Sequence, residues 1–275
     1  MSDCSTCPSN GKCGENKEKC MIENNPLNKV KKIIGVMSGK GGVGKSTVSV
    51  LLAKALNKKG YKVGILDSDI TGPSIPRLLN LNGKRAQGIG ENIVPVTTED
   101  GIKVISLNLL ISNEEDPVIW RGPIIGGAVK QFWTGVLWEE LDYLIIDMPP
   151  GTGDVAITVM QTIPIDGIVM VSIPQDLVSM IVSKAVNMVN GQKIKILGVI
   201  ENMGYILCPD CGKKINIYDG ENTNKFLEEK NLNLLGELPI VSSISNFSST
   251  NDEDRDKVID SYFNPIVNNI LKGLE

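Results

Sequence analysis

The sequence predicts an α/β fold with a doubly wound, mostly parallel sheet and helices on both faces. Three observations lead to this prediction. Nearly continuous apolar runs of strand length alternate with longer stretches of helical periodicity. A glycine-rich loop lies between the first such run and the first helical stretch. The chain of 275 residues is long enough to bury one core of this kind, and it contains no internal repeat.

The predicted elements follow one another in a regular order. Residues 33–38 form an apolar run of strand length, residues 48–59 carry an apolar helical face, and residues 62–66 form a second strand. This order is a βαβ unit, in which the two strands are parallel. Further strands are predicted at residues 102–107, 143–146, 167–173, 194–200 and 232–238, and helices at residues 126–138, 155–162, 176–190 and 256–274. Residues 83–92 are predicted to be a loop.

The first thirty residues differ in composition from the rest of the chain. They hold four cysteines among many polar residues and show little apolar periodicity: Cys4, Cys7, Cys13 and Cys20. Residues 1–30 are therefore predicted to be a cysteine-containing N-terminal extension, flexible unless a metal or a partner orders it. Residues 31–275 are predicted to form the folded domain.

Composition narrows the range of functions. The net charge of −4 argues against wide contact with nucleic acid, which requires a basic surface. No apolar run approaches the roughly 20 residues of a membrane span, and the polar start lacks a secretory signal. We therefore expect a cytoplasmic protein without membrane association, in which clustered cysteines more often bind metal than form disulfides. The absence of histidine excludes histidine-based catalysis and histidine-containing zinc sites.

The glycine-rich loop matches the phosphate-binding pattern G-x-x-x-x-G-K-S/T. Its glycines let backbone N–H groups surround phosphates at the N-terminus of the following helix. Lys45 is expected to contact the β- and γ-phosphates of ATP, and the Ser46 hydroxyl to ligate Mg²⁺. The predicted nucleotide-binding loop consists of Gly39, Lys40, Gly41, Gly42, Val43, Gly44, Lys45, Ser46 and Thr47.

Two further carboxylates are expected at the same edge of the sheet. Asp147 follows the apolar run at residues 143–146, which is the arrangement of a Walker B strand, and should hold Mg²⁺ through its water shell. Asp67 and Asp69 follow the second strand. Ligands bind at the carboxyl ends of the strands in such sheets, which favours a functional role for Asp69 over a solvated loop carboxylate.

Several motifs together resemble a known family. KGGVGKST at residues 40–47 resembles the deviant Walker A loop of the dimeric ATPases that include ParA, MinD and the nitrogenase iron protein. DSDITGPSIP at 67–76, WRGP at 120–123, DMPPGTGD at 147–154, ENM at 201–203 and CPDC at 208–211 narrow the resemblance to the Mrp, or ApbC-type, iron–sulfur cluster carriers. The resemblance covers roughly residues 28–274.

The resemblance implies roles for individual residues. In that family the early lysine, here Lys40, reaches the ATP of the partner subunit, which implies a homodimer. Asp69 would position the attacking water, and Asn202 would read the adenine. Cys208 and Cys211 of two subunits would together hold a 4Fe-4S cluster. The implied activity is slow ATP hydrolysis coupled to transfer of that cluster from a scaffold donor to apo iron–sulfur proteins.

The spacing of the cysteines leaves other metal sites open. Two cysteines supply half of a four-cysteine cluster, and a twofold axis would supply the other half. The segment at residues 208–213 also resembles half of a zinc ribbon. Cys4, Cys7 and Cys13 resemble the last three ligands of an N-terminal cluster motif in the eukaryotic cytosolic branch. Cys20 departs from that motif, so a second cluster, a zinc site and metal-free thiols are all possible there.

Three other functions compete with a cluster carrier. A positioning ATPase of the ParA or MinD type predicts a basic DNA-binding face or an amphipathic membrane-binding tail. Electron transfer like that of the nitrogenase iron protein predicts a cysteine just after the Walker B strand, and residues 148–155 contain none. A zinc-binding regulatory NTPase is left open by the CxxC segment.

Overall fold

The computed structural model describes residues 22–70, 72–111, 122–177, 180–208, 210–217 and 221–275. Within them, nine strands form one sheet in the order β10-β9-β8-β1-β7-β2-β6-β5, and β11 also pairs with β9. The parallel strands are β1 (Lys29–Ser38), β2 (Val63–Asp67), β6 (Lys103–Ile105), β7 (Glu140–Asp147), β8 (Gly167–Ser172), β9 (Ile196–Leu207) and β11 (Leu234–Pro239). Two strands at the ends of this order pair antiparallel, β5 (Val96–Thr97) with β6 and β10 (Lys214–Asn216) with β9.

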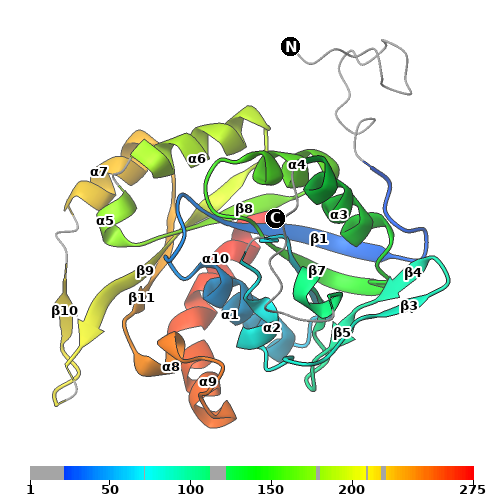
Figure 1. Ribbon diagram of the computed structural model, residues 1–275. Coiled ribbons are helices and arrows are strands. Elements are labelled where there is room, and N and C mark those ends of the chain that lie inside the picture. Colours follow the sequence, from blue (N-terminus) through cyan, green and yellow to red (C-terminus); the bar gives the residue numbers. More distant parts are fainter. Residues whose placement is uncertain (1–21, 71, 112–121, 178–179, 209, 218–220) are drawn as a thin grey trace.

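Helices cover both faces of the sheet, as Figure 1 shows. One face carries α3 (Gly122–Thr134), α4 (Asp154–Thr162), α6 (Met180–Gly191) and α7 (Glu221–Glu229). The other carries α1 (Lys45–Lys58), α2 (Ile75–Leu78), α8 (Ser242–Ser245), α9 (Asp252–Val258), the π-helical turn Ile259–Phe263 and α10 (Asn264–Leu274). Short helical segments at Leu107–Leu109 and α5 (Pro174–Leu177) complete the described elements. The predicted doubly wound α/β fold is therefore confirmed.

The sheet lies between two apolar cores, which explains why its strands have nearly continuous apolar sequences. In β1, for example, Ile34 and Val36 face the core beneath α1, whereas Ile33 and Met37 face the core beneath α3, α4 and α6. Alternate residues thus enter opposite cores, and both sets must be apolar. The same burial on two faces makes β2 and β8 fully buried.

Several sequence predictions need correction. The helix predicted at 126–138 runs from Gly122 to Thr134 instead. The helix predicted at 256–274 is two helices, α9 and α10, joined by the π-helical turn. Residues 83–92, predicted to be a loop, contain β3 (Gln87–Ile89), which forms a two-stranded hairpin with β4 (Asn92–Val94). Gly90 turns this hairpin with a φ of 60°. Its strands have three residues each, β3 is exposed and β4 is half-buried, so neither has the buried apolar run that predicts a strand. The predicted strand at 194–200 is also too short, because β9 continues to Leu207 as one arm of a hairpin with β10.

The N-terminal part of the domain begins earlier than residue 31. The Trp133 indole nitrogen donates to the Ile22 carbonyl at 2.8 Å, and the Asn28 amide donates to the Val136 carbonyl at 2.8 Å. β1 starts at Lys29. Residues from Ile22 onward are therefore fastened to α3 and the segment after it. The extension predicted at residues 1–30 otherwise lies outside the described residues.

None of the helices in the described part of the chain has the length and apolar character needed to cross a bilayer.

Candidate nucleotide site and cysteine hairpin

The phosphate loop lies between β1, which ends at Ser38, and α1, which begins at Lys45. Gly42 and Gly44 have φ values of 81° and 83°, in the left-handed region that favours glycine. A Cβ on Gly44 would also lie 2.2 Å from the side-chain nitrogen of Asn202. The loop therefore turns the chain directly into the N-terminus of a 14-residue helix, where backbone N–H groups can bind phosphate.

A cavity of about 370 Å³ opens beside this loop. It brings together side chains from the loop and α1, from the segment after β2, from the loop after β7 and from the loop after α8. Its lining includes Gly41, Gly42, Gly44, Lys45, Ser46, Thr47, Asp69, Arg77, Pro150 and Ser248. The structure thus places most of the predicted loop residues and Asp69 around one cavity.

Asp147 lies at the centre of the polar groups. Its carboxylate is fully buried and receives the Lys45 ammonium at 2.7 Å and the Ser46 hydroxyl at 2.6 Å. Ser49 donates to the other carboxylate oxygen at 2.7 Å. The groups predicted to meet phosphate and Mg²⁺ therefore converge on one point, and their hard oxygen donors suit Mg²⁺. Asp69 is near, with its carboxylate 3.8 Å from the Lys45 ammonium.

Asp67 is a buried neighbour of this cluster. Its carboxylate accepts the Ser106 hydroxyl at 3.0 Å and the backbone N–H groups of Asp69 at 3.2 Å and Ile75 at 3.4 Å. Burial, and then the charge of Asp147, raise the pKa of Asp67 well above its usual range. Asp67 thereby ties together both ends of the segment that carries Asp69.

Lys40 and Lys45 occupy different surroundings although both belong to the loop. Lys45 is buried against Asp147, whereas Lys40 is exposed at the outside of the loop. The Lys40 carbonyl accepts the Ser38 hydroxyl at 2.8 Å, which fixes the backbone at this position. Gly39 is held close to α6, since a Cβ there would lie 3.2 Å from Ile181 and Val182 side-chain carbons.

Asn202 packs against the phosphate loop from β9. Its side-chain nitrogen donates to the Val43 carbonyl at 2.9 Å, and its side-chain oxygen accepts the Met203 N–H at 3.0 Å. The residue is 2% exposed, and Met203 adopts a φ of 57° beside it. In this position Asn202 supports the loop. Its expected contact with adenine remains a prediction.

The CxxC segment forms the tip of the hairpin between β9 and β10. The Cys208 N–H donates to the Lys213 carbonyl at 3.0 Å, and the Gly212 N–H donates to the Cys208 carbonyl at 2.9 Å. Cys208 is half-buried and Cys211 is exposed, and neither forms a disulfide. Hydrogen bonds from the backbone of Cys211 and Asp210, and from the Cys211 thiol, lower the pKa of Cys208.

The tip of this hairpin carries one half-buried and one exposed cysteine, without a complete metal site. Among the described residues no group of three or more cysteine, histidine or carboxylate side chains could hold a metal ion. The hairpin extends beyond the sheet at the end where the phosphate loop lies, as Figure 1 shows. Cys4, Cys7, Cys13 and Cys20 lie outside the described residues.

Comparison with known proteins assigns the chain to a family. Residues 29–273 match the family described as "ParA: NUBPL iron-transfer P-loop NTPase". The chain belongs to this family. The match spans nearly the whole folded domain and includes both the phosphate loop and the cysteine hairpin.

Relatives within the NUBPL family are similar over most of the chain. An iron–sulfur cluster carrier protein from Clostridium perfringens is 47% identical, with 100% of each chain covered. A protein of the same name from Methanocaldococcus jannaschii is 44% identical over 86% of this chain and 83% of its own. A cytosolic Fe-S cluster assembly factor, Nubp2 homolog 2 from Drosophila yakuba, is 42% identical over 90% of this chain and 98% of its own.

Solved structures agree with the fold. A nucleotide-binding protein from Archaeoglobus fulgidus, in complex with ADP, has a TM-score of 0.72 at 40% identity, covering 88% of this chain and 91% of its own. MinD from Pyrococcus furiosus has a TM-score of 0.57 at 18% identity, covering 88% and 98%. At that identity the likeness to MinD concerns the fold alone.

Sequence reasoning missed several polar residues of the site in this NUBPL-family chain. They are Ser49, Ser68, Ser106, Arg77 and Ser248. The spacing held a signal for Ser49, because a residue four positions after Lys45 lies on the same helix face. For Ser106 and Ser248 no such signal exists, since only the folding of the chain brings them to Asp67 and to the phosphate cavity.

Proposed function

We propose that this chain binds and hydrolyses ATP and carries a 4Fe-4S cluster, which it passes to apo-proteins. The observation that carries the proposal is the hairpin that presents Cys208 and Cys211 at the same end of the sheet as the phosphate loop. Family membership and the names of the relatives support it. The cluster is cargo in this proposal and ATP is the substrate.

Each predicted residue has a part in the nucleotide reaction. Lys45 neutralises charge on the β- and γ-phosphates, and Asp69 orients the attacking water. Ser46 would ligate Mg²⁺ and Asp147 would hold it through its water shell, and the ion would neutralise phosphate charge. The Ser46 hydroxyl and the Asp147 carboxylate lie 2.6 Å apart, so the two donors can face one ion. Asn202 binds the adenine while supporting the loop.

The cluster requires a homodimer. One protomer offers two thiols at the hairpin tip, and a twofold axis adds the same two from its partner. Exposed Lys40 would cross this interface to the ATP of the partner. In the cytoplasm, a scaffold protein would donate the cluster and apo iron–sulfur proteins would receive it.

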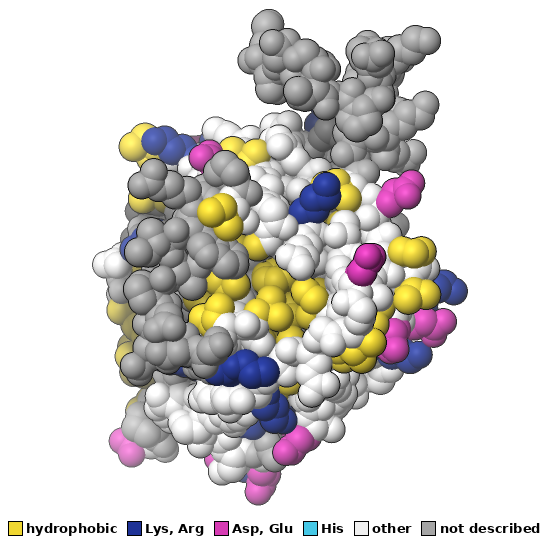
Figure 2. All heavy atoms as spheres, turned by 45° about the vertical axis from the view of Figure 1, so that its right-hand side comes forward, with side chains coloured by type: hydrophobic (Ala, Val, Ile, Leu, Met, Phe, Trp, Pro, Cys, Tyr) yellow, Lys and Arg dark blue, Asp and Glu magenta, His cyan; other side chains and the backbone are white. Residues whose placement is uncertain are grey.

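A positioning ATPase receives less support from the surface. The last helix, α10, buries Ile266, Val267 and Ile270 against β9, β11 and α1, so its apolar face is already used within the domain. Figure 2 shows acidic and basic side chains interspersed around the margins of one face, with hydrophobic side chains in its middle. This face therefore lacks the basic patch that binding to DNA requires.

Anaerobic reconstitution with iron and sulfide tests the proposal. Absorbance, Mössbauer spectra and iron content per dimer would be measured for wild type and for the Cys208→Ala/Cys211→Ala variant. We expect a 4Fe-4S signal in wild type that the variant loses. A Cys4→Ala/Cys7→Ala variant is the matched control and should keep the signal of the hairpin site.

Two outcomes would contradict the proposal. A signal that persists in the Cys208→Ala/Cys211→Ala variant would place the cluster on other cysteines. If zinc alone binds, a zinc-binding regulatory NTPase becomes the better interpretation, because a CxxC hairpin is also half of a zinc ribbon.

A further inference from the structure

The wall of the phosphate cavity includes a loop from a distant part of the chain. Ser248 lines the cavity although it follows α8, about 200 residues after the phosphate loop. The Asn246 carbonyl accepts the backbone N–H groups of Ser249 at 3.0 Å and Thr250 at 3.1 Å, so the segment is a tight turn. The position of this turn therefore sets the position of one side of the phosphate cavity.

Two side chains from different elements hold the same carbonyl of this turn. The Arg255 guanidinium, on α9, donates to the Ser248 carbonyl at 2.7 Å and to the Phe247 carbonyl at 2.9 Å. The Asn80 side-chain nitrogen, just after α2, donates to the Ser248 carbonyl at 2.9 Å. Hydrogen bonds from a charged donor are stronger than neutral ones, so Arg255 is the stronger of the two.

Asn80 connects this carbonyl to the segment that carries Asp69. It follows α2, whose Arg77 and Leu78 also line the phosphate cavity. Asn80 adopts a φ of 54°, a left-handed conformation that turns its side chain away from the helix it follows. The Ser248 carbonyl is therefore a junction between the segment after Asp69 and the C-terminal helices.

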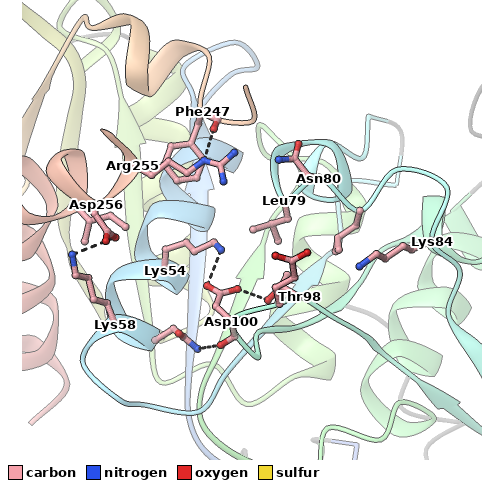
Figure 3. A pocket seen from close by; sticks show the side chains of 14 residues that line it. Lys54, Lys58, Leu79, Asn80, Lys84, Thr98, Asp100, Phe247, Arg255 and Asp256 are labelled. Carbon is pink, nitrogen blue, oxygen red and sulfur yellow. Dashed lines mark hydrogen bonds and ion pairs between the residues drawn. The ribbon is translucent and has the colours of Figure 1, made fainter. Parts of the chain in front are cut away.

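A second cavity, of about 500 Å³, lies beneath this junction and is shown in Figure 3. Arg255, with Phe247 beside it, lies on one side of this cavity, and Asn80 lies on the other side near Leu79; Lys54 pairs with Asp100 below them. Phe247 anchors one side of this turn in the core beneath α1, whereas the next residue, Ser248, is fixed by the two side chains that donate to its carbonyl. The Arg255 guanidinium also lies 5.4 Å from the centre of the Phe247 ring, which further fixes the arginine.

We infer that Arg255 and Asn80 are positioning residues for the nucleotide, acting together through the Ser248 carbonyl. They fix the position of Ser248, which lines the phosphate cavity, so that the bound nucleotide contacts it there. The inference rests on the proposal that ATP occupies the phosphate loop. Both residues lie away from the loop itself, and neither is predicted to touch the reacting phosphate.

Steady-state ATPase kinetics of Arg255→Met and Asn80→Gly test the inference. Glycine readily adopts the positive φ at residue 80 and removes the side chain with its amide donor. If Ser248 moves, ATP should bind more weakly in the ground state and in the transition state alike. KM for ATP should therefore rise, about tenfold for Arg255→Met, while kcat stays within about twofold. Partial unfolding would instead lower kcat and leave KM unchanged. Arg255→Lys, which keeps the charge but only one donor group, should lie in between.

The double variant tests whether the two residues act through one carbonyl. Its KM should be close to that of Arg255→Met, because neighbours that share a partner are not additive. Lys257→Met is the matched control on α9, since Lys257 is exposed and pairs with Glu253 and Asp254, and it should match wild type. If Arg255→Met does not fold, Asn80→Gly and its KM carry the test alone, since residue 80 is exposed.

Three results would overturn the inference. An unchanged KM in both single variants would show that the wall does not depend on them. Fully additive effects would show that they act separately. A wild-type chain that neither binds nor hydrolyses ATP would overturn the proposed function as well, and this result is distinct from the other two.

Discussion

At the scale of single residues, Asp147 shows how the fold holds a charge in its interior. A fully buried carboxylate is costly unless donors surround it. Lys45, Ser46 and Ser49 supply those donors to its oxygens, and Ser68 donates to its backbone carbonyl at 2.7 Å. The buried charge is thus kept at the point where phosphate and Mg²⁺ are predicted to bind.

The buried Asp67 carboxyl should make the unfolding free energy depend on pH. Its pKa is raised by burial and by Asp147, so the folded state binds this proton more tightly than the unfolded state does. The stability that Asp67 contributes is complete below its unfolded pKa of about 4 and is lost as pH rises through the folded pKa. Asparagine resembles the neutral form. Asp67→Asn should therefore gain unfolding free energy relative to wild type between pH 5 and pH 8, measured by urea denaturation.

A carboxylate with the opposite shift provides the control. The hydrogen bond from Lys31 lowers the pKa of Asp142, so this group is ionised in both states above pH 5. The curves of wild type and Asp142→Asn should run parallel from pH 5 to pH 8. Parallel curves for Asp67→Asn as well would contradict the predicted shift.

At the scale of elements, β9 joins the nucleotide site to the cysteine hairpin. Its first half is buried between β8 and β11, Asn202 in its middle supports the phosphate loop, and Cys208 follows its end. A register shift next to Gly198 lets the strand fit both neighbours. A displacement at one end of this single strand is therefore expected to reach the other.

Gly198→Ala should destabilise the domain. Gly198 has a φ of 151°, and an added Cβ would lie 2.5 Å from the Asn233 carbonyl oxygen and 2.7 Å from Leu235 Cγ. We expect a loss of about 2–4 kcal/mol in unfolding free energy, since strain and overpacking add. Urea denaturation measures it.

Gly127→Ala is the matched control in α3. A Cβ at Gly127 meets nothing within 4 Å, and alanine favours a helix over glycine by about 1 kcal/mol. This variant should be as stable as wild type or more so. A Gly198→Ala variant of equal stability would show that β11 can move away from β9 without cost.

At the scale of the whole molecule, the two loop lysines lie in different surroundings. The fold buries Lys45 within its own protomer and leaves Lys40 at the surface. Both lie in one motif, yet only Lys45 is buried. An exposed Lys40 is what the proposed dimer, with its shared nucleotide sites, would require.

Lys40→Ala should bind nucleotide but lose dimer formation that depends on ATP. Removing one partner of an interfacial charge pair typically costs about 2–5 kcal/mol, so the dimer dissociation constant should rise by a factor on the order of 30 or more. Light scattering after size exclusion, with and without ATP, measures it. Lys84→Ala, which changes an exposed lysine outside the loop, is the control. Dimer formation equal to wild type in Lys40→Ala would refute this role.

Local pattern alone determined the fold class and the core of the nucleotide site. The apolar runs predicted the strands because β1, β2 and β8 are buried between two cores, and the loop motif predicted Lys45 and Ser46 because its chemistry depends on neighbours in the chain. Asp147 followed from its place at the end of an apolar strand. The hairpin of β3 and β4 was not predicted because these three-residue strands, one exposed and one half-buried, have no such apolar run.

Only the tertiary structure decided which distant groups complete the site. Ser106 reaches Asp67, and Ser248 reaches the phosphate cavity, through contacts across more than 30 residues of chain. Arg255 and Asn80 both donate to the Ser248 carbonyl, and Asn80 lies 168 residues before Ser248 in the chain. No hydrophobic periodicity or sequence motif predicts such long-range contacts, because they depend on how the two layers of helices pack against the sheet. The same packing sends Lys45 inward to Asp147 and leaves Lys40 outside.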